Sequence, residues 1–142
     1  GQDMIATFSN YGKDGVDVFA PGVAIYSTIP DSEYDDAQGT SMASPVVAGI
    51  AATLRSYYPT LSAKQVKEII MASTLPIEAK VKRPGDQSLV SASEISVTGG
   101  VVNLYEAVKL AEKTKGKSKR KNTKWRNYNA QWKEIQADKS RA

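Results

Sequence analysis

The sequence of 142 residues contains no cysteine and no histidine. Without cysteine the chain forms no disulfide bond and offers no thiolate to a metal, and without histidine it lacks the commonest zinc ligand and the most frequent general base. No apolar run approaches the roughly 18 residues of a membrane-spanning helix, and no signal peptide is recognisable. Any catalysis must therefore depend on other side chains or on groups outside this chain.

Positive charge is concentrated at one end of the sequence. Residues 113–142 contain eleven Lys or Arg and two acids, a net charge of +9, while the whole chain carries +4. Residues 1–112 therefore carry −5. This change in composition predicts a boundary at residue 112, between a folded body and a basic C-terminal tail or helix.

The tail combines its charge with aromatic side chains. Trp125, Tyr128, Trp132 and Ile135 are three to four residues apart, the spacing of one helix face. Such a segment can bind nucleic acid or an anionic surface, or its aromatics can dock a terminal helix on the acidic body. We favour a docked or solvated tail over a nucleic-acid partner, because aromatics at helical spacing more often pack against protein than stack on bases.

The most informative stretch is residues 39–49, which read GTSMASPVVAG. Residues 46–54 carry no charge, and a helix that is apolar all round is typically buried. Gly39 leaves room for close approach of the backbone, Thr40 can act as the N-cap, and Pro45 is expected in or near the first turn. The stretch therefore predicts a buried helix that begins here.

Ser41 falls at the start of this predicted helix. The first N–H groups of a helix lack partners inside it, and with the positive end of the helix dipole they favour developing negative charge. A serine there can attack a carbonyl while its own N–H stabilises the oxyanion. Because a serine at a helix start is more often only a cap, the motif alone leaves both roles open.

Residues 39–49 closely resemble the nucleophile segment of the subtilisin-like serine peptidases, the subtilase or S8 family. Further matching segments flank them: FSNYG at 8–12, VDVFAPGV at 16–23 and IYST at 25–28 upstream, and YPTLS at 58–62 and GGVVN at 99–103 downstream. The resemblance covers most of residues 5–75 and about 97–112. One departure is Val46, where many members carry histidine, and it bears on the subfamily only.

The resemblance implies an α/β fold of three layers with a largely parallel sheet, of which this chain would be only the C-terminal portion. It also implies an aspartate, a histidine and an oxyanion-hole asparagine, all of which precede the serine in the family. Only forty residues precede Ser41, and none is histidine. We therefore expect these partners in an N-terminal half of the catalytic domain that is missing from this sequence, which begins with Gly1.

For function, the resemblance implies a serine-type endopeptidase that hydrolyses peptide bonds through an acyl-enzyme on Ser41. Ser41 would be the nucleophile and would supply an oxyanion-hole N–H, while Gln38 and Gly39 would border the leaving-group side of the cleft. The expected substrate is a peptide or protein, and the expected location is secreted or periplasmic. No cofactor is expected in this chain, although the complete enzyme can carry calcium. Without the aspartate and histidine, the chain alone should be inactive.

Two other classes of function stay open at this point. The chain can belong to a non-catalytic relative that kept the serine segment and lost other triad residues. Alternatively, the basic tail can be the functional part, as a module that binds an anionic surface or nucleic acid. The upstream sequence would decide the first alternative, and salt-sensitive binding by residues 113–142 would decide the second.

The region before the motif contains further recognisable elements. Apolar and β-branched residues predict strands at 4–9 and 16–20, followed by a ribbon over residues 23–38 that turns at Pro30. Carboxylates crowd this turn and can bind calcium, although a solvated acidic loop is the simpler interpretation. These acids are Asp31, Glu33, Asp35 and Asp36.

Two helices are predicted after the apolar one. Ser62 and Gln65 have the spacing of a capping box, and Asn103 with Glu106 resembles a cap with its acid three residues on. Apolar residues recur at helical spacing behind both starts. The second of these helices is expected to end the catalytic-domain part at about residue 112.

The segment between these two helices has no clear period. Residues 76–100 contain Pro76, a Pro84-Gly85 pair and a serine-rich run, which predict an insertion or surface excursion. Short edge strands can form within it, at 80–82 and 94–97. We assign no chemistry to this segment.

Overall fold

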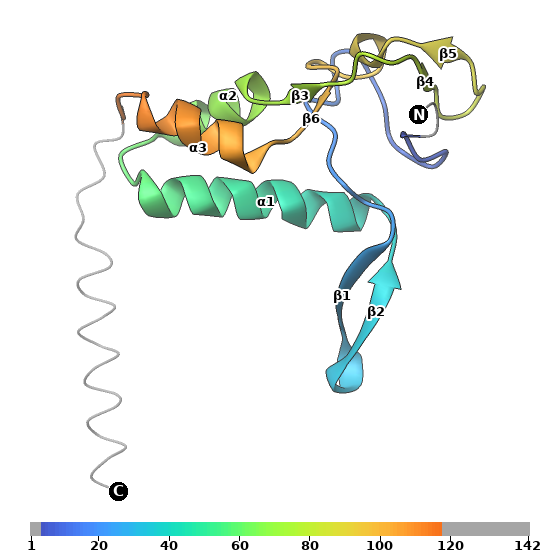
Figure 1. Cartoon of the computed structure of the whole chain (residues 1–142), viewed down its shortest axis with the longest axis horizontal. Coiled ribbons are helices and arrows are strands. Elements are labelled where there is room, and N and C mark those ends of the chain that lie inside the picture. Colours follow the sequence, from blue (N-terminus) through green and yellow to red (C-terminus); the bar gives the residue numbers. More distant parts are fainter. Residues whose placement is uncertain (1–3, 118–142) are drawn as a thin grey trace, which may run out of the picture.

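The structure is a computed structural model, and it describes residues 4–117. It contains both helices and strands, as an α/β fold requires (Figure 1). In chain order the elements are β1 (Ile25–Ile29), η1 (Pro30–Ser32), β2 (Glu33–Ala37), α1 (Thr40–Tyr57), α2 (Ala63–Ala72), β3 (Leu75–Pro76), β4 (Val81–Lys82), β5 (Leu89–Val90), η2 (Ala92–Glu94), β6 (Gly100–Val101) and α3 (Leu104–Glu112). Among these residues no helix is both long and apolar enough to cross a membrane.

The three α-helices form one packed unit. Helices α2 and α3 both lie on the same side of α1 (Figure 1). Between them is a cluster of buried side chains, contributed by all three helices and the α1–α2 loop: Ile50, Leu54, Leu61, Val66, Ile69, Ile70, Ala107 and Ala111. Burial of this apolar surface is the main force that holds the unit together.

The caps predicted for α2 and α3 are both confirmed. The Ser62 hydroxyl accepts from the Gln65 N–H at 3.2 Å, and the Ser62 N–H donates to Gln65 Oε1 at 3.1 Å, which completes a capping box. The Asn103 side chain accepts from the Glu106 N–H at 3.1 Å. Each bond satisfies one of the unpartnered N–H groups at a helix start.

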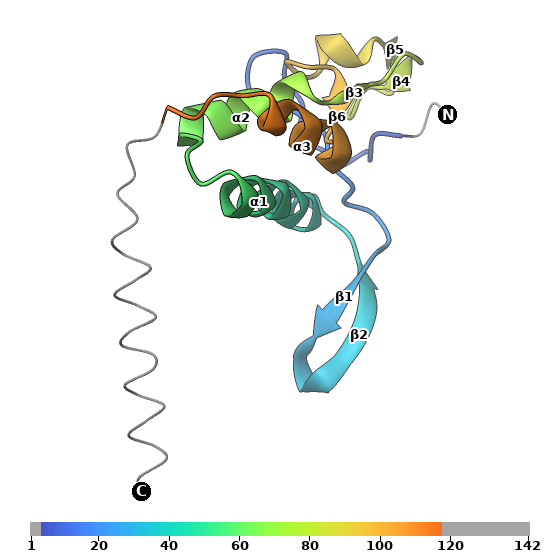
Figure 2. The same ribbon diagram turned by 60° about the vertical axis from the view of Figure 1, so that its left-hand side comes forward.

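Helix α1 is less buried than its sequence predicts. Of its 18 residues, Ile50 and Leu54 are buried, while Ala48, Gly49 and Ala52 are exposed. Because α2 and α3 cover one side only, nothing in the described part of the chain covers the other side (Figure 2). The prediction of a helix buried all round is therefore wrong for residues 4–117.

The strands pair in three two-stranded antiparallel sheets, β1–β2, β3–β6 and β4–β5. The strands predicted at 4–9 and 16–20 do not form. Residues 16–19 do lie beside residues 97–102 and bond to them, for example from the Val97 N–H to the Val16 carbonyl at 2.8 Å, but the regular ladder of a strand is not completed. The Ser9 N–H instead donates to the Ala6 carbonyl at 2.9 Å and closes a turn, and Phe19 makes an isolated parallel bridge to Val101. Within residues 4–117 parallel pairing is confined to this bridge, so the largely parallel sheet remains an expectation for the complete domain.

Residues 76–100 contribute to a second buried cluster. Val81, Val90, Ala92 and Ile95 pack there with Ile5 and Phe19 from the N-terminal segment. A strand forms at 81–82 as predicted, but the one expected at 94–97 does not. Instead the N–H groups that follow η2 donate back to the Ala92 carbonyl at 3.1 Å, which keeps the chain in a tight turn.

The predicted ribbon over residues 23–38 is confirmed as the β1–β2 hairpin. It projects from the start of α1, away from the helical unit, in both views (Figures 1 and 2). The proposed docking of the basic tail involves residues that lie almost entirely outside the described part of the chain. The domain boundary at residue 112 likewise stays a prediction.

Candidate functional site

The turn before α1 is built by glycine. Gly39 is the N-cap residue, with φ +143° and ψ 167°, a backbone conformation that favours glycine. Thr40 is the first helical residue, and no side chain caps the helix. The expectation that Thr40 acts as the cap is therefore wrong, because the φ that the turn requires shifts the helix start by one residue.

A second glycine holds this turn in place. The Gly39 N–H donates to the Gly22 carbonyl at 2.7 Å. A Cβ atom on Gly22 would lie 2.9 Å from the Gly39 carbonyl oxygen and 3.3 Å from the Ala43 Cβ, closer than real Cβ atoms normally approach. The two segments therefore meet so closely that only glycine fits at position 22 without a shift.

Ser41 is the second residue of α1 and is exposed. Among the hydrogen bonds of residues 4–117, none uses the Ser41 hydroxyl or the Ser41 N–H. The next two N–H groups, of Met42 and Ala43, donate to the Gly39 carbonyl at 3.0 and 3.4 Å. The hydroxyl and N–H of Ser41 thus lie together at the positive end of the helix dipole, where both can reach an incoming group.

Pro45 is the sixth residue of α1, which places it in the second turn, next to the first. Proline has no N–H to donate to the carbonyl four residues earlier, and that carbonyl belongs to Ser41. The Ser41 carbonyl therefore lacks its usual helical donor. The first turn, which carries Ser41, is tied to the rest of α1 by one hydrogen bond fewer than an ordinary turn.

The three predicted site residues fall within four positions of the chain, Gln38 to Ser41, so the structure keeps them together. Gln38 is exposed and Gly39 is half-buried, and both immediately precede the turn that presents Ser41. Since the chain has no histidine, no imidazole of this chain can serve Ser41. Among residues 4–117, Ser41 thus offers a hydroxyl and an N–H without hydrogen-bond partners, and no histidine accompanies them.

The acids proposed as calcium ligands do not converge. Successive strand residues point to opposite faces, so Asp35 and Asp36 lie on opposite faces of the hairpin. Among residues 4–117, no group of three or more acidic side chains is arranged to hold a metal ion. The hairpin acids therefore do not bring together the six or more oxygen ligands that calcium takes.

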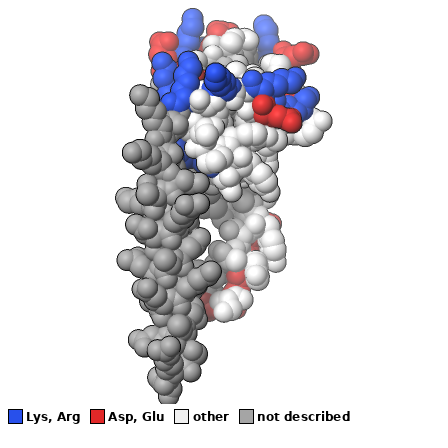
Figure 3. All heavy atoms as spheres, turned by 90° about the vertical axis from the view of Figure 1, so that its left-hand side faces the viewer, with Lys and Arg blue, Asp and Glu red and all other residues white. Residues whose placement is uncertain are grey.

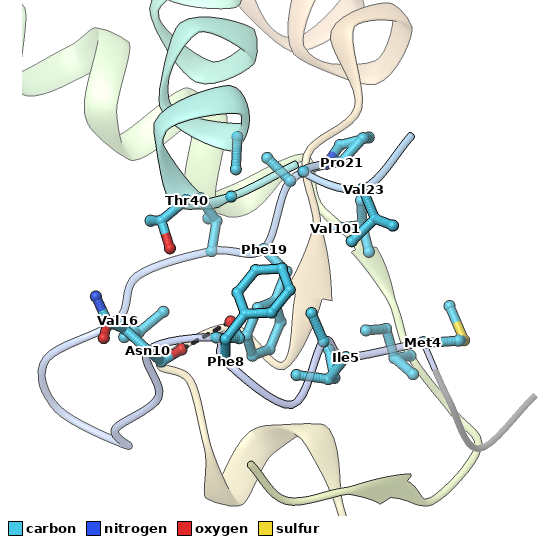
Figure 4. Close-up of a pocket in the computed structure, with 18 of the residues that line it drawn as sticks. Met4, Ile5, Phe8, Asn10, Val16, Phe19, Pro21, Val23, Thr40 and Val101 are labelled. Carbon is cyan, nitrogen blue, oxygen red and sulfur yellow. Dashed lines mark hydrogen bonds between the residues drawn. The ribbon is translucent and has the colours of Figure 1, made fainter. Parts of the chain in front are cut away.

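A mostly apolar cavity of about 520 Å³ lies beside the same turn (Figure 4). Side chains of Met4, Ile5, Phe8, Phe19, Val23 and Val101 line it, and Gly39, Thr40 and Ala43 form its boundary at α1. Sequence reasoning missed this cavity, because the apolar residues of 4–9 and 16–20 were assigned to paired strands. Ser41 is not among the lining residues, so the cavity is a neighbour of the serine and not its cleft.

Comparison with known proteins assigns the chain to a family. The model of the Subtilase family matches residues 1–132, so the chain belongs to this family of serine peptidases. It is 56% identical over 62 residues to Subtilisin DY of Bacillus licheniformis, a match that covers 44% of this chain and 22% of that protein. It is 39% identical over 100 residues to Subtilisin-like protease 2 of Plasmodium falciparum, covering 66% of this chain and 7% of that protein.

Solved structures agree on the fold. The subtilase cytotoxin SubAB matches with a TM-score of 0.57 and 26% identity over 69% of this chain and 27% of the solved chain. The A-subunit of an AB5 toxin from E. coli matches with a TM-score of 0.53 and 25% identity over 65% of this chain and 26% of the solved chain. The chain thus has part of a subtilase fold, and it spans less than a third of these relatives.

Proposed function

We propose that this chain supplies the nucleophile of a serine endopeptidase whose remaining catalytic groups come from another part of the same catalytic domain. The observation that carries the proposal is the exposure of Ser41 and its lack of hydrogen bonds. Ser41 is an exposed residue at the start of α1, and its hydroxyl and N–H make no hydrogen bond within residues 4–117, in a chain of the subtilase family. A side chain with no structural bond at a helix start is available for chemistry.

The proposed reaction is acyl transfer. Ser41 Oγ attacks the carbonyl carbon of the scissile peptide bond, and a histidine outside this chain takes the hydroxyl proton and returns it to the leaving amine. The Ser41 N–H donates to the oxyanion of the tetrahedral intermediate, beside an asparagine that also lies outside this chain. Water then releases the acyl group from Ser41. Without the histidine, Ser41 is an ordinary alcohol, so we expect the chain alone to be inactive.

The residues that precede the α1 turn are assigned to one side of the substrate cleft. Gln38 and Gly39 lie three and two residues before Ser41, and we assign them to the leaving-group side of the cleft. The substrate class is a peptide or protein, and the location that fits the family is secreted or periplasmic. Calcium in the complete enzyme would need ligands other than the divergent hairpin acids.

The test uses the chain joined to its upstream coding sequence and a serine-directed fluorophosphonate probe. We expect the complete protein to be labelled, and we expect Ser41→Ala to lose the label. Ser44→Ala is the matched control, because Ser44 is an exposed serine of the same helix, and it should keep the label. The 142-residue chain alone should show background labelling only.

Three outcomes would contradict parts of this proposal. Label that persists in Ser41→Ala would show that another residue is the nucleophile. Strong labelling of the 142-residue chain by itself would show that its general base lies within it. A folded complete protein that takes no label would identify a non-catalytic relative.

A further inference from the structure

One face of the β1–β2 hairpin is left uncovered by the residues that the structure describes. The register pairs Tyr26 with Asp36 and Thr28 with Tyr34, so these four side chains share a face, which we call the tyrosine face. All four are exposed, and Tyr26 and Tyr34 retain 71% and 60% of their surface. The two rings stack at a centroid distance of 5.7 Å. Two large aromatic side chains are thus displayed side by side, with an acid beside them.

The hairpin is also the acidic part of the molecule. Residues 14–54 contain six acids and no Lys or Arg, and four of these acids lie between residues 31 and 36. The ion pairs of residues 4–117 use carboxylates elsewhere, at Asp17, Glu68, Asp86 and Glu106. On the face shown in Figure 3, Lys and Arg gather at the end that carries the helices, and the charged side chains of the hairpin are acidic. Its negative charge is therefore available to an external cation.

The chain itself contains a segment of matching chemistry. Residues 118–142 hold eight Lys or Arg and two acids, a net charge of +6, together with Trp125, Tyr128 and Trp132. We propose that this basic segment docks on the tyrosine face of its own hairpin. Cationic side chains would lie over the tyrosine rings and pair with Asp36, while Glu33 and Asp35 on the opposite face of the hairpin add to the attraction at low ionic strength. Within the described residues, Lys109 already makes such a contact, with its Nζ 4.9 Å from the Tyr105 ring centroid.

The segment is long enough to reach the hairpin. It leaves the body near the start of α2, where the Gln65 side chain donates to the Lys115 carbonyl and accepts from the Lys117 N–H, both at 2.9 Å. The hairpin begins at the opposite end of α1, which is about 27 Å long, and adds about 17 Å. An extended segment of residues 118–142 spans about 80 Å. Reach is therefore no obstacle, even if much of the segment is not extended.

Charge complementarity favours the basic segment over nucleic acid or an anionic surface as the occupant of the tyrosine face. Nucleic acid and anionic surfaces would be repelled by the hairpin acids, so they compete for the tail and not for the tyrosine face. A second copy would bring its own tail to the same hairpin, and protein concentration would separate that case from an intramolecular contact.

The experiment uses the full 142-residue chain and its natural fluorophores. The only two tryptophans lie in the segment, so tryptophan emission reports on it alone. Because the chain has no cysteine, Ser32→Cys carries a single nitroxide at the exposed tip of the hairpin. Ala79→Cys carries the same label at an exposed position between β3 and β4 and serves as the control. A diamagnetic analogue of the label gives the unquenched reference for each.

We expect the Ser32 label to reduce tryptophan emission at least twofold at low ionic strength, and the Ala79 label to leave it unchanged. About 1 M NaCl should abolish the quenching, because it screens charges beyond roughly 3 Å. Glu33→Gln, Asp35→Asn and Asp36→Asn together should also abolish it. The matched triple variant Glu68→Gln, Glu78→Gln and Glu112→Gln removes the same charge from exposed acids outside the hairpin and should leave it intact.

Several results would overturn the proposal. Equal emission with the two labels at low salt would show that the segment does not lie on the hairpin. Quenching that grows with protein concentration would assign the contact to a second copy. If the Ser32 label fails to quench while single-stranded DNA binds the chain with steep salt dependence, the partner of the tail is nucleic acid. The salt titration needs no change to the acids, so the test survives if the triple hairpin variant does not fold.

Discussion

Two serines mark the starts of two neighbouring helices, and the structure uses them in opposite ways. Ser62 is the N-cap of α2, and it exchanges hydrogen bonds of 3.1 and 3.2 Å with Gln65. Gln65 is itself buried and holds the backbone of Lys115 and Lys117. Ser41 lies one residue inside α1, is exposed, and makes no hydrogen bond through its hydroxyl within residues 4–117.

The difference separates a serine that holds a helix start from one whose hydroxyl holds nothing within residues 4–117. At α2 the serine side chain stabilises the helix start, so its replacement should weaken the fold. At α1 that stabilisation comes from Gly39 and Gly22, through the left-handed turn and the close approach of the two backbones. The α1 start therefore forms without help from Ser41, and its hydroxyl is left without a hydrogen-bond partner among residues 4–117.

The largest expected effect tests whether glycine builds the α1 start. Gly22→Ala would place a Cβ 2.9 Å from the Gly39 carbonyl oxygen, a backbone atom that cannot simply turn away. We expect the free energy of unfolding, measured by urea denaturation, to fall by about 1–3 kcal/mol. Gly15→Ala is the matched control, because a Cβ there meets no atom within 4 Å.

Gly15→Ala should be neutral, or should stabilise by up to about 1 kcal/mol through the lower entropy of the unfolded chain. If Gly22→Ala behaves like Gly15→Ala, the α1 start tolerates a shift, and the close approach does not hold the serine turn in place.

The next effect tests the two serines directly. Ser62→Ala removes the capping box, and we expect the free energy of unfolding to fall by about 1 kcal/mol. Ser41→Ala removes an exposed side chain without a hydrogen bond, and we expect a change within about 0.5 kcal/mol. Both variants are measured against the unsubstituted chain in the same urea titration. A loss at Ser41 as large as that at Ser62 would give Ser41 a structural role and weaken the comparison.

The sequence predicts the caps of α2 and α3 correctly and the cap of α1 wrongly, for a physical reason. The Ser62–Gln65 capping box and the Asn103–Glu106 bond depend on residues three apart in the chain, so spacing alone reveals them. The cap at Gly39 depends on Gly22, seventeen residues earlier, and no local pattern records that contact. Sequence reasoning therefore chose Thr40 as the cap, although it found the serine motif and the family.

The same distinction explains the errors in the strands and in α1. The hairpin was predicted because its two strands are adjacent in sequence and pair with each other. Apolar patterns at 4–9 and 16–20 indicate burial, but they do not say which segment lies alongside. Likewise an uncharged helix indicates that its surface can be buried, whereas packing decides which side is covered. The helices and the locally paired hairpin were readable, while strands and contacts that depend on partners distant in the chain were not.

The smallest effect tests the uncovered side of α1. Gly49 is exposed in the interior of this helix, and a Cβ there would meet no atom within 4 Å. Gly49→Ala should therefore raise the free energy of unfolding of this chain by about 0.5–1 kcal/mol. The reason is that glycine loses more backbone conformational entropy than alanine when it is fixed in a helix. Ala52→Gly, at an exposed position on the same helix, should lower it by a similar amount.

Gly49→Ala and Ala52→Gly, made in the complete protein, show whether further chain packs against this side of α1. If further chain packs against Gly49, the added methyl group meets it, and Gly49→Ala should change from stabilising to destabilising. If the gain persists in the complete protein, this side of α1 stays in contact with water. Because the Gly49 carbonyl also accepts from the Thr53 hydroxyl at 2.9 Å, Thr53→Val serves as a control for effects on that bond alone. If the effect of Gly49→Ala on the free energy of unfolding changes sign between this chain and the complete protein, while the effect of Thr53→Val does not, the change is due to packing at position 49.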